Sequence, residues 1–376
     1  MKKTIVPVLI FALTVFIFAG CSGSESDIVE LSTGEENVDS GVRTIKDSLG
    51  RTVEIPADVE RIVPLGNTPR MLVYLGLADK VVGISGFDEE FLSPLQAYAY
   101  ANKDLWGKLP VVGTDAAGAT DYYPEEIISV HPDVILCSYT GELADEIQSK
   151  TGTPVVAVPM GTLFGKDYEQ ALRILGDVCG VKDRAEDVIT YINDCLYDLN
   201  ALTEDIPDAD KPTVLGAAAT FKGMHGIEGV YANYSVFKTI NANDVTKGIS
   251  DVASGVLVDK EQILKWNPEI IFFDYSGVSL VKTDYAENSD FYAQLTAVEN
   301  GKLYQYPNST YYYSNVEIPI VNSYYVATIV YAEQLKNIVF KEKASEIFEF
   351  FLGDGDYLTK LEDAGAGYCK ITLDGD

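Results

Sequence analysis

The sequence contains few of the residue patterns that support catalysis. His131 and His225 are the only two histidines, so a metal site with three histidine ligands is excluded and a His-ligated zinc or manganese site is disfavoured. No GxSxG nucleophile motif occurs. Residues 161–167 are one residue short of a phosphate-binding loop, and the glycines within 223–229 do not have the spacing of a dinucleotide fingerprint. We therefore expect a protein that is not an enzyme and holds no cofactor.

Cationic, aromatic and polar side chains instead follow several predicted strands. Arg70 comes after the apolar run 61–66. Lys222 and His225 come after the run 212–220. Because open α/β sheets place ligands at the carboxyl ends of their strands, these loops are expected to face one binding site. The predicted ligand-binding residues are Asn67, Thr68, Arg70, Phe87, Thr114, Tyr139, Met160, Phe221, Lys222, His225, Tyr275, Tyr312, Asn315 and Glu317.

Several of these residues also have a structural explanation. Arg70 could pair with an acid on its own helix, and His225 could brace the glycine-rich loop. The three consecutive tyrosines at 311–313 cannot all face one site in an extended segment, since neighbouring side chains alternate between its two sides. At least one tyrosine is therefore expected to be structural. Direct metal coordination by His225 or a tyrosine is a further alternative.

The element expected to organise these loops is one long helix, residues 182–206. Its apolar residues recur at steps of three and four, which places them on one helical face. Gly180 can end the preceding helix, and Pro207 lacks the N–H that would continue this one. At ~1.5 Å per residue the helix would be about 37 Å long. The apolar positions are Ala185, Val188, Ile189, Ile192, Cys195, Leu196, Leu199 and Leu202.

A repeated pattern lies on either side of this helix. Residues 125–136 and 261–272 both begin with Glu, continue as a short helix and pass through Pro and an acid into an apolar strand. Strands and helices alternate elsewhere, which is typical of α/β lobes with mainly parallel sheets. A chance likeness of two common helix-to-strand joints is the alternative. The predicted domains are an N-terminal lobe at 42–181, the linker helix at 182–206 and a C-terminal lobe at 207–376.

The N-terminus predicts export. Lys2 and Lys3 precede an apolar run that ends in Ala19, Gly20 and Cys21, as in a bacterial signal peptide. The last four residues of this segment resemble a lipobox, which implies that Cys21 is the lipidation site and that residues 1–20 are removed. An ordinary signal peptide cut nearby is the alternative. Residues 21–41 are polar and acidic with few large apolar side chains, so we expect a disordered tether.

The net charge indicates which partners are disfavoured, and the cysteine pattern indicates whether disulfides are expected. Asp and Glu number 57 against 28 Lys and Arg, giving a formal net charge of −29. Such a surface repels nucleic-acid phosphates and anionic headgroups, so neither is expected as a partner. Four cysteines follow Cys21 without a CxxC motif, and buried free thiols are the default expectation. The exported compartment would nevertheless permit one disulfide.

Several motifs together resemble the substrate-binding proteins of ABC importers for iron complexes, siderophores, haem and cobalamin. Residues 44–51 followed by 59–66 resemble the opening of those proteins, and residues 77–84 and both repeat units continue the likeness from about 42 to about 350. The resemblance implies two Rossmann-like lobes with mainly parallel sheets, joined by one long α-helix, with the ligand cleft between them. It also implies little lobe motion when ligand binds.

The resemblance further assigns partners. Glu125 and Glu261 match the acids that dock against Arg on the two permease subunits, while acids favoured at a helix start are the structural alternative. The implied protein is a monomer anchored by lipid to the outer face of the cell membrane, serving a permease dimer with its ATPase subunits. Its ligand would be a metal chelate, and the shared framework does not distinguish siderophore, haem and corrinoid. The rival interpretations are an exported chelatase-like enzyme, with His225 and Glu317 as acid and base, and a surface sensor.

Overall fold

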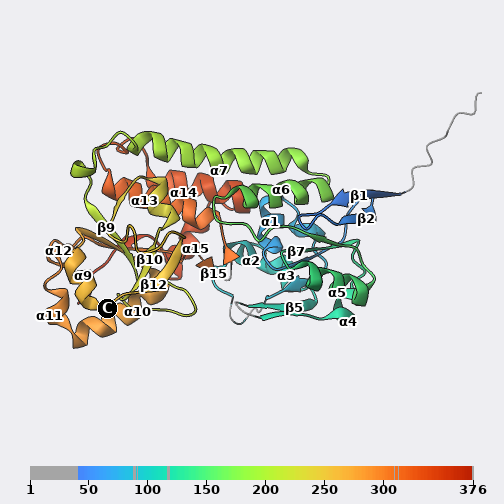
Figure 1. The fold of residues 1–376 in the computed structure, drawn as a ribbon, viewed down its shortest axis with the longest axis horizontal. Coiled ribbons are helices and arrows are strands. Elements are labelled where there is room, and N and C mark those ends of the chain that lie inside the picture. Colours follow the sequence, from blue (N-terminus) through green and yellow to red (C-terminus); the bar gives the residue numbers. More distant parts are fainter. Residues whose placement is uncertain are drawn as a thin grey trace, which may run out of the picture. The chain divides into compact units, whose positions relative to one another are not determined.

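The computed structural model describes residues 41–87, 90, 92–116, 119–308, 310–311 and 313–374. Strands and helices alternate along these residues, as the sequence predicts (Figure 1). The central strands pair in parallel and are buried, which explains their continuous apolar sequences. The fold is α/β, with two Rossmann-like lobes and a long helix that joins them.

The N-terminal lobe contains a parallel sheet in the order β3-β7-β8 and a second sheet in the order β4-β5-β6, preceded by the hairpin β1-β2. Its strands are β1 (Val42–Lys46), β2 (Thr52–Pro56), β3 (Ile62–Leu65), β4 (Ile84–Ser85), β5 (Val111–Ala116), β6 (Ala119–Tyr122), β7 (Val134–Cys137) and β8 (Val155–Ala157). Its helices are α1 (Thr68–Tyr74), η1 (Ala78–Lys80), α2 (Ala97–Ala101), α3 (Lys103–Trp106), α4 (Pro124–Ser129), α5 (Gly141–Thr151) and α6 (Lys166–Val178).

The long helix α7 (Lys182–Thr203) crosses from one lobe to the other in Figure 1. It ends at Thr203 and not at residue 206, because the chain turns ahead of Pro207. Its predicted apolar face is buried apart from Leu196, which is half-buried, and Leu202, which is 39% exposed. α6 packs so closely on it that a Cβ added to Gly176 would lie 2.6 Å from the Cβ of Ala185. Only glycine at 176 permits this approach.

The C-terminal lobe contains one mixed sheet in the order β12-β10-β9-β13-β14-β17, with β11 beside β9. Its strands are β9 (Thr213–Ala217), β10 (Gly229–Ala232), β11 (Asn243–Asp244), β12 (Ser254–Leu257), β13 (Ile270–Asp274), β14 (Leu303–Tyr306) and β17 (Cys369–Lys370), and a separate hairpin holds β15 (Thr310–Tyr311) and β16 (Tyr313–Ser314). Its shorter helices are η2 (Asp208–Asp210), α8 (Ser235–Thr239), α9 (Lys260–Trp266), α10 (Tyr275–Glu287), α11 (Ser289–Tyr292) and α12 (Thr296–Glu299).

Three final helices, α13 (Glu317–Val330), α14 (Phe340–Leu352) and α15 (Tyr357–Asp363), provide a second connection between the lobes. Arg184 of α7 donates a hydrogen bond to the carbonyl oxygen of Phe350 at 2.7 Å. Tyr357 donates one to the carbonyl oxygen of Pro94, also at 2.7 Å. The chain then returns to the C-terminal lobe, where β17 pairs antiparallel with β14. The lobes are therefore held by more than α7 alone.

None of the helices formed by the described residues is long and apolar enough to cross a membrane.

Candidate ligand-binding cleft

A cavity of about 320 Å³ lies where loops of the two lobes meet, beyond the carboxyl end of β9. The N-terminal lobe contributes residues 161–163, and the C-terminal lobe contributes the rest. The volume is in the range of small-molecule sites, and the lining combines aromatic rings with hydroxyl groups. The described lining residues are Gly161, Thr162, Leu163, Thr220, Phe221, Tyr231, Tyr234, Ser235, Ala253, Ser254 and Gly255.

Two stacked tyrosines form one wall of this cavity. The rings of Tyr231 and Tyr234 are nearly parallel, with centroids 4.4 Å apart. The Tyr231 hydroxyl donates a hydrogen bond to Oδ2 of Asp274 at 2.7 Å, which fixes the orientation of its ring. Asp274 is fully buried, and burial raises its pKa to about 6 although hydrogen bonds from Tyr231 and Ser276 act in the opposite direction. The orientation of this wall therefore depends on a hydrogen bond to a buried carboxyl group.

Sequence reasoning did not select Tyr231, Tyr234 or Asp274. Tyr231 lies inside a strand, and its partner Asp274 lies 43 residues further along the chain. The one available signal is that Asp274 ends an apolar strand and begins a helix, where its side chain accepts a hydrogen bond from the Ser276 N–H. That pattern predicts a helix cap but not a cavity wall.

Phe221 is the predicted ligand residue that lines the cavity. Its ring lies 4.2 Å from the ring of His225, centroid to centroid, and His225 donates a hydrogen bond from Nε2 to the Phe221 carbonyl oxygen at 2.8 Å. A Cβ added to Gly255 would lie 2.0 Å from Cδ1 of Phe221. The position of this ring thus depends on a glycine in the neighbouring strand β12. The hydrogen bond from His225 stabilises the loop, which agrees with the structural explanation given for this residue above. Lys222 is exposed and has a left-handed backbone, with a φ of 49°.

Asn67, Arg70 and Asn315 meet in the interior and not at the cavity. All three are buried, with at most 1% of each residue exposed. Arg70 donates from Nε to Oδ1 of Asn315 at 3.0 Å and from Nη1 to Oδ1 of Asn67. Its guanidinium also lies over the ring of Tyr98, 4.6 Å from the centroid. Asn67 in turn donates to the carbonyl oxygen of Met160 at 2.5 Å. These bonds connect α1 with the loop before α13.

Glu317, at the start of α13, lies in the same interior. Tyr74 donates a hydrogen bond to its Oε2, while its Oε1 has no hydrogen-bond partner among the described residues. Burial raises the pKa of Glu317 to about 7, and the bond from Tyr74 and the charge of Arg70 oppose that rise. The hydroxyl of Tyr168 is also buried without a partner among the described residues, and burial raises its pKa. Glu317 is therefore a buried carboxyl group that takes up a proton at a higher pH than an exposed Glu does.

The other predicted ligand residues are spread over several environments. Thr68 and Phe87 are buried in the N-terminal lobe. The hydroxyl groups of Thr114 and Tyr123 are hydrogen-bonded at 2.7 Å. Tyr275 donates to the carbonyl oxygen of Ala364 at 3.1 Å. The structure thus places these four side chains outside the lining of the 320 Å³ cavity.

The remaining predicted ligand residues are Met160, Tyr139 and Tyr312. Met160 is 55% exposed and directly precedes Gly161 of the cavity lining. Tyr139 is half-buried, and a Cβ added to Gly66 would lie 3.1 Å from its Cε1. Tyr312 and the predicted lipidation site Cys21 lie outside the described residues.

The two Glu-containing repeat units have the same construction. α4 leads into β7, and α9 leads into β13, each strand being central in its sheet. The residue between helix and strand has a left-handed backbone in both units, with φ 44° at His131 and 43° at Asn267. Their agreement in backbone geometry supports a true structural repeat over a chance likeness of sequence.

The acid after the proline has the same structural role in both units. Asp133 accepts hydrogen bonds through Oδ2 from the backbone N–H groups of Glu60 and Arg61, both at 2.8 Å. Glu269 accepts one through Oε2 from the N–H of Thr213 at 2.8 Å. Each carboxylate therefore holds the start of the neighbouring parallel strand in register.

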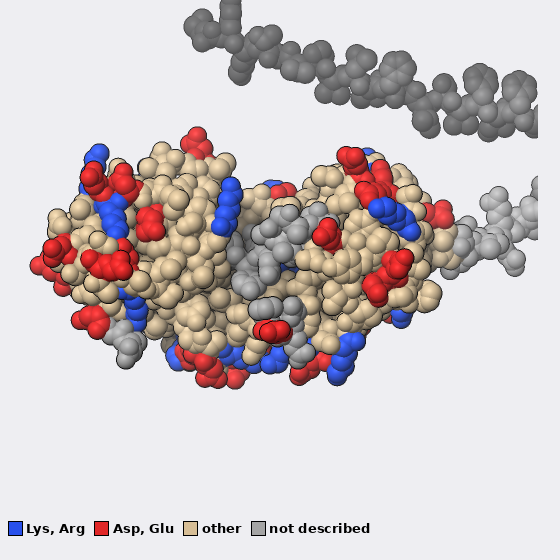
Figure 2. Space-filling model, turned by 90° about the horizontal axis from the view of Figure 1, so that it is seen from below, with Lys and Arg blue, Asp and Glu red and all other residues tan. Residues whose placement is uncertain are grey.

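Glu125 and Glu261 occupy equivalent positions in the first turns of α4 and α9. Both are exposed, and neither has a hydrogen bond or an ion pair with the described part of the chain. α4 and α9 lie in different lobes, below α7 in Figure 1. On the face turned away from α7, Asp and Glu side chains gather toward both ends (Figure 2). The two carboxylates are thus available to an external partner.

The described residues contain free cysteines but no cluster of side chains that could hold a metal ion. Cys137, Cys179 and Cys195 are buried free thiols, as expected, while Cys369 is free and exposed. Burial raises the pKa of Cys179 to about 12 and that of Cys195 to about 11, so both are protonated and poorly reactive. No group of three His, Cys, Asp or Glu that could hold a metal ion is found in these described segments.

The overall fold is shared with solved bacterial binding proteins. A periplasmic solute-binding protein from Veillonella parvula has a TM-score of 0.65 and 20% sequence identity, covering 83% of this chain and 93% of its own. The molybdate-binding protein MolA from Haemophilus influenzae has a TM-score of 0.62 and 17% identity, with 83% and 98% covered. The TroA-like binding protein FepB from V. parvula gives 0.59 and 19%, with 83% and 96% covered. At these identities the likeness concerns the fold.

Among curated proteins, none has a sequence that matches this chain. The family model described as periplasmic binding protein matches residues 66–310, which include both repeat units, α7 and all of the described cavity-lining residues. Proteins of this family are extracytoplasmic, bind small-molecule solutes and work with ABC transporter permeases; they are not enzymes. The chain belongs to the periplasmic binding protein family.

Proposed function

We propose that this solute-binding protein is anchored by a lipid and delivers an iron chelate of siderophore type, or a related metal macrocycle such as haem or a corrinoid, to an ABC permease. The observation that carries the proposal is the cavity between the lobes, with Phe221, Tyr231 and Tyr234 in its lining. Large rings bury much apolar area at little entropic cost, which suits a large planar or cyclic ligand.

The ligand class rests on the cavity itself, because proteins of this fold differ in what they carry. MolA was solved with molybdate, a small inorganic anion. The described lining of the present cavity instead consists of aromatic, hydroxyl-bearing, small and apolar side chains. Rings and hydroxyl groups offer stacking and hydrogen bonds to an organic chelator, and the metal would be carried as part of that substrate.

The proposed permease contacts are Glu125 and Glu261. Exposed carboxylates can form bidentate, charge-assisted bonds with Arg, and two such contacts at separate lobes would fix the orientation of docking. The proposed anchor is Cys21, whose neighbours resemble a lipobox. It would keep the protein at the outer face of the membrane, close to its permease, as a monomer.

Titration of the purified protein with a ferric siderophore, haemin and cobalamin tests the ligand class, with quenching of Tyr and Trp fluorescence as the readout. We expect one of them to quench at micromolar concentration with a stoichiometry of one and no turnover. Phe221→Ala should weaken that ligand about tenfold by removing one aromatic wall. Tyr275→Phe is the matched control outside the cavity and should bind normally.

Three results would redirect the proposal. Absence of quenching by all three probes would exclude the chelate class while leaving the family assignment intact. Normal uptake of the bound chelate after deletion of the gene would instead favour a surface sensor, since a sensor binds the same ligand without importing it. Conversion of the chelate during the titration would favour the enzyme alternative.

A further inference from the structure

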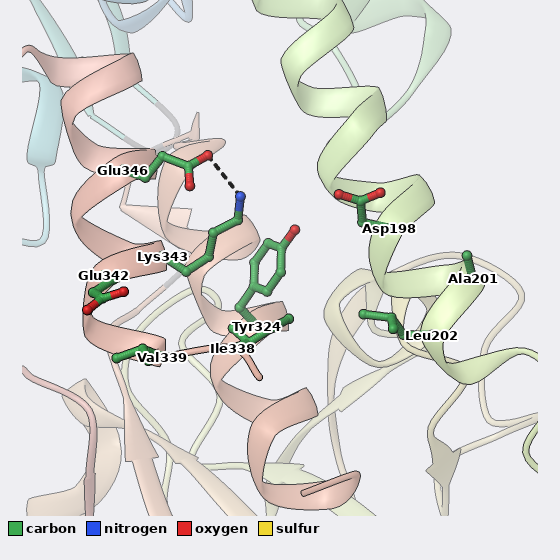
Figure 3. A pocket seen from close by; sticks show the side chains of 9 residues that line it. All are labelled: Asp198, Ala201, Leu202, Tyr324, Ile338, Val339, Glu342, Lys343 and Glu346. Atoms are coloured by element: carbon green, nitrogen blue, oxygen red, sulfur yellow. Dashed lines mark hydrogen bonds and ion pairs between the residues drawn. The ribbon is translucent and has the colours of Figure 1, made fainter. Parts of the chain in front are cut away.

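A second and larger cavity lies away from the cleft, in a groove between α7 and α14 (Figure 3). Its volume is about 530 Å³, and Tyr324 of α13 lies at its floor. Because the helices on its two walls both link the lobes, an occupant would contact two separate inter-lobe connections. The groove is lined by Asp198, Ala201, Leu202, Tyr324, Ile338, Val339, Glu342, Lys343 and Glu346.

The groove carries more negative than positive charge. Its lining contains the carboxylates Asp198, Glu342 and Glu346 but only one cation, Lys343. Lys343 is ion-paired with Glu346 at 2.9 Å, and the same carboxylate oxygen accepts a hydrogen bond from Tyr191 at 2.9 Å. Asp198 and Glu342 have no hydrogen bond or ion pair with any described residue. Two carboxylates therefore lack a neutralising partner.

Between these carboxylates the groove exposes apolar surface. Leu202 on α7 is 39% exposed, and Val339 at the start of α14 is 56% exposed. Figure 3 shows the Asp198 side chain directed from α7 toward the groove and the Tyr324 hydroxyl rising from the floor. Burial raises the pKa of Tyr324, and Cys195, Asp198 and Glu346 raise it further, so the phenol at the floor stays protonated.

We propose that this groove is a second binding site, and that its ligand is an organic cation with an apolar body, such as a hydrophobic primary or quaternary amine. The apolar body would cover Leu202 and Val339, which removes exposed apolar surface from water. The ammonium group would neutralise Asp198 or Glu342. An anion of the same shape is repelled by both carboxylates, so charge is the feature that selects the ligand.

A matched pair of probes with one indole ring tests the charge requirement. Isothermal titration calorimetry should detect tryptamine, a cation, at a Kd on the order of 0.1 mM, as expected for a ligand of this size. Indole-3-propionate, an anion, should bind at least about tenfold more weakly, because one unfavourable charge contact is of that magnitude. Thermal unfolding should shift upward with tryptamine, since binding to the folded state stabilises it.

Variants localise the binding to the groove and separate it from the cleft. Asp198→Asn with Glu342→Gln should weaken tryptamine at least about tenfold. Both residues are exposed, so this variant should keep the unfolding temperature of the unliganded protein. Asp205→Asn with Glu333→Gln removes the same charge at exposed residues outside the groove and should leave the affinity unchanged. Equal binding of both probes, undiminished binding by the groove variant, or no binding of tryptamine at millimolar concentration would overturn the proposal.

Discussion

Arg70 of α1 donates a hydrogen bond from Nε to Oδ1 of Asn315, a residue 245 positions further along the chain, at a distance of 3.0 Å. Both residues are fully buried. The bond ties the first helix of the N-terminal lobe to the loop before α13, which belongs to the second connection between the lobes. Wide opening of the lobes would break this bond, so we expect the lobes to move little relative to each other when ligand binds.

Replacement of this guanidinium should destabilise the protein markedly. Arg70→Lys keeps the charge but loses the planar set of donors, so Asn67 and Asn315 cannot both be satisfied. We expect a loss of about 2 to 3 kcal/mol in the free energy of unfolding, measured with urea. Arg173→Lys, at an exposed ion pair on α6, is the control and should change stability much less. Equal effects of the two substitutions would contradict the buried role of Arg70.

Glu317 should make stability depend on pH near neutrality. Burial raises its pKa from 4.5 to about 7, so between these values the folded state holds a proton that the unfolded state releases. Stability from this group is therefore fully present below pH 4.5 and is lost progressively as the pH rises through about 7. The hydrogen bond from Tyr74, a hydrogen bond from the Glu317 backbone and the charge of Arg70 lower the pKa of Glu317, but they do not cancel the effect of burial.

The variant Glu317→Gln isolates this effect. Urea unfolding of the native protein should show a decline of a few kcal/mol between about pH 5 and pH 8, and the variant should lack most of it. Asp274, with a pKa of about 6, contributes in the same direction in both proteins, so the difference between their two pH profiles reports on Glu317. Parallel pH profiles of the two proteins would exclude Glu317 as the source.

Gly255→Ala tests the packing of the cavity wall. Its added Cβ would lie 2.0 Å from the Phe221 ring, so the ring must move. We expect about tenfold weaker chelate binding with only a moderate fall in the unfolding temperature. Gly141→Ala adds the same methyl group where its nearest neighbour is 3.6 Å away, and it should bind normally. An unchanged affinity in Gly255→Ala would remove Phe221 from the proposed contact surface.

Asp133 should contribute to stability through the hydrogen bonds that its carboxylate accepts from two backbone N–H groups. Asp133→Ala leaves these donors without their carboxylate, and we expect a loss of about 1 to 2 kcal/mol by urea unfolding. Asp205→Ala, at an exposed acid without such bonds, should have little effect. If both variants unfold alike, the acid after the proline has no role in holding the strand.

The sequence predicted the features that depend on local patterns. The three- and four-residue periodicity located α7, and the repeated helix-to-strand units predicted α4 with β7 and α9 with β13. Phe221 was found because it follows a strand that ends at the cleft. These signals need only neighbouring residues, since the period of a helix and the end of a strand are visible in a short window.

The remaining parts of the site depend on pairs that are distant in sequence. Tyr231 meets Asp274 across 43 residues, and Tyr74 meets Glu317 across 243. Arg70 was predicted to face the ligand because it follows a strand, whereas in the fold its guanidinium donates hydrogen bonds to two buried amides. Only the tertiary arrangement decides whether such a polar side chain faces a cavity or completes an internal network.

The central claim, delivery of a chelate to a permease by a docked binding protein, is tested most directly by combining Glu125→Ala with Glu261→Ala. Uptake of the iron-labelled chelate by cells and chelate affinity of the purified protein are measured for this variant and for Glu142→Ala with Glu287→Ala, which removes the same charge from two other exposed residues. We expect uptake to be lost only in the Glu125 and Glu261 variant and affinity to be unchanged in both variants. Uptake at the native rate in the Glu125 and Glu261 variant would contradict the central claim.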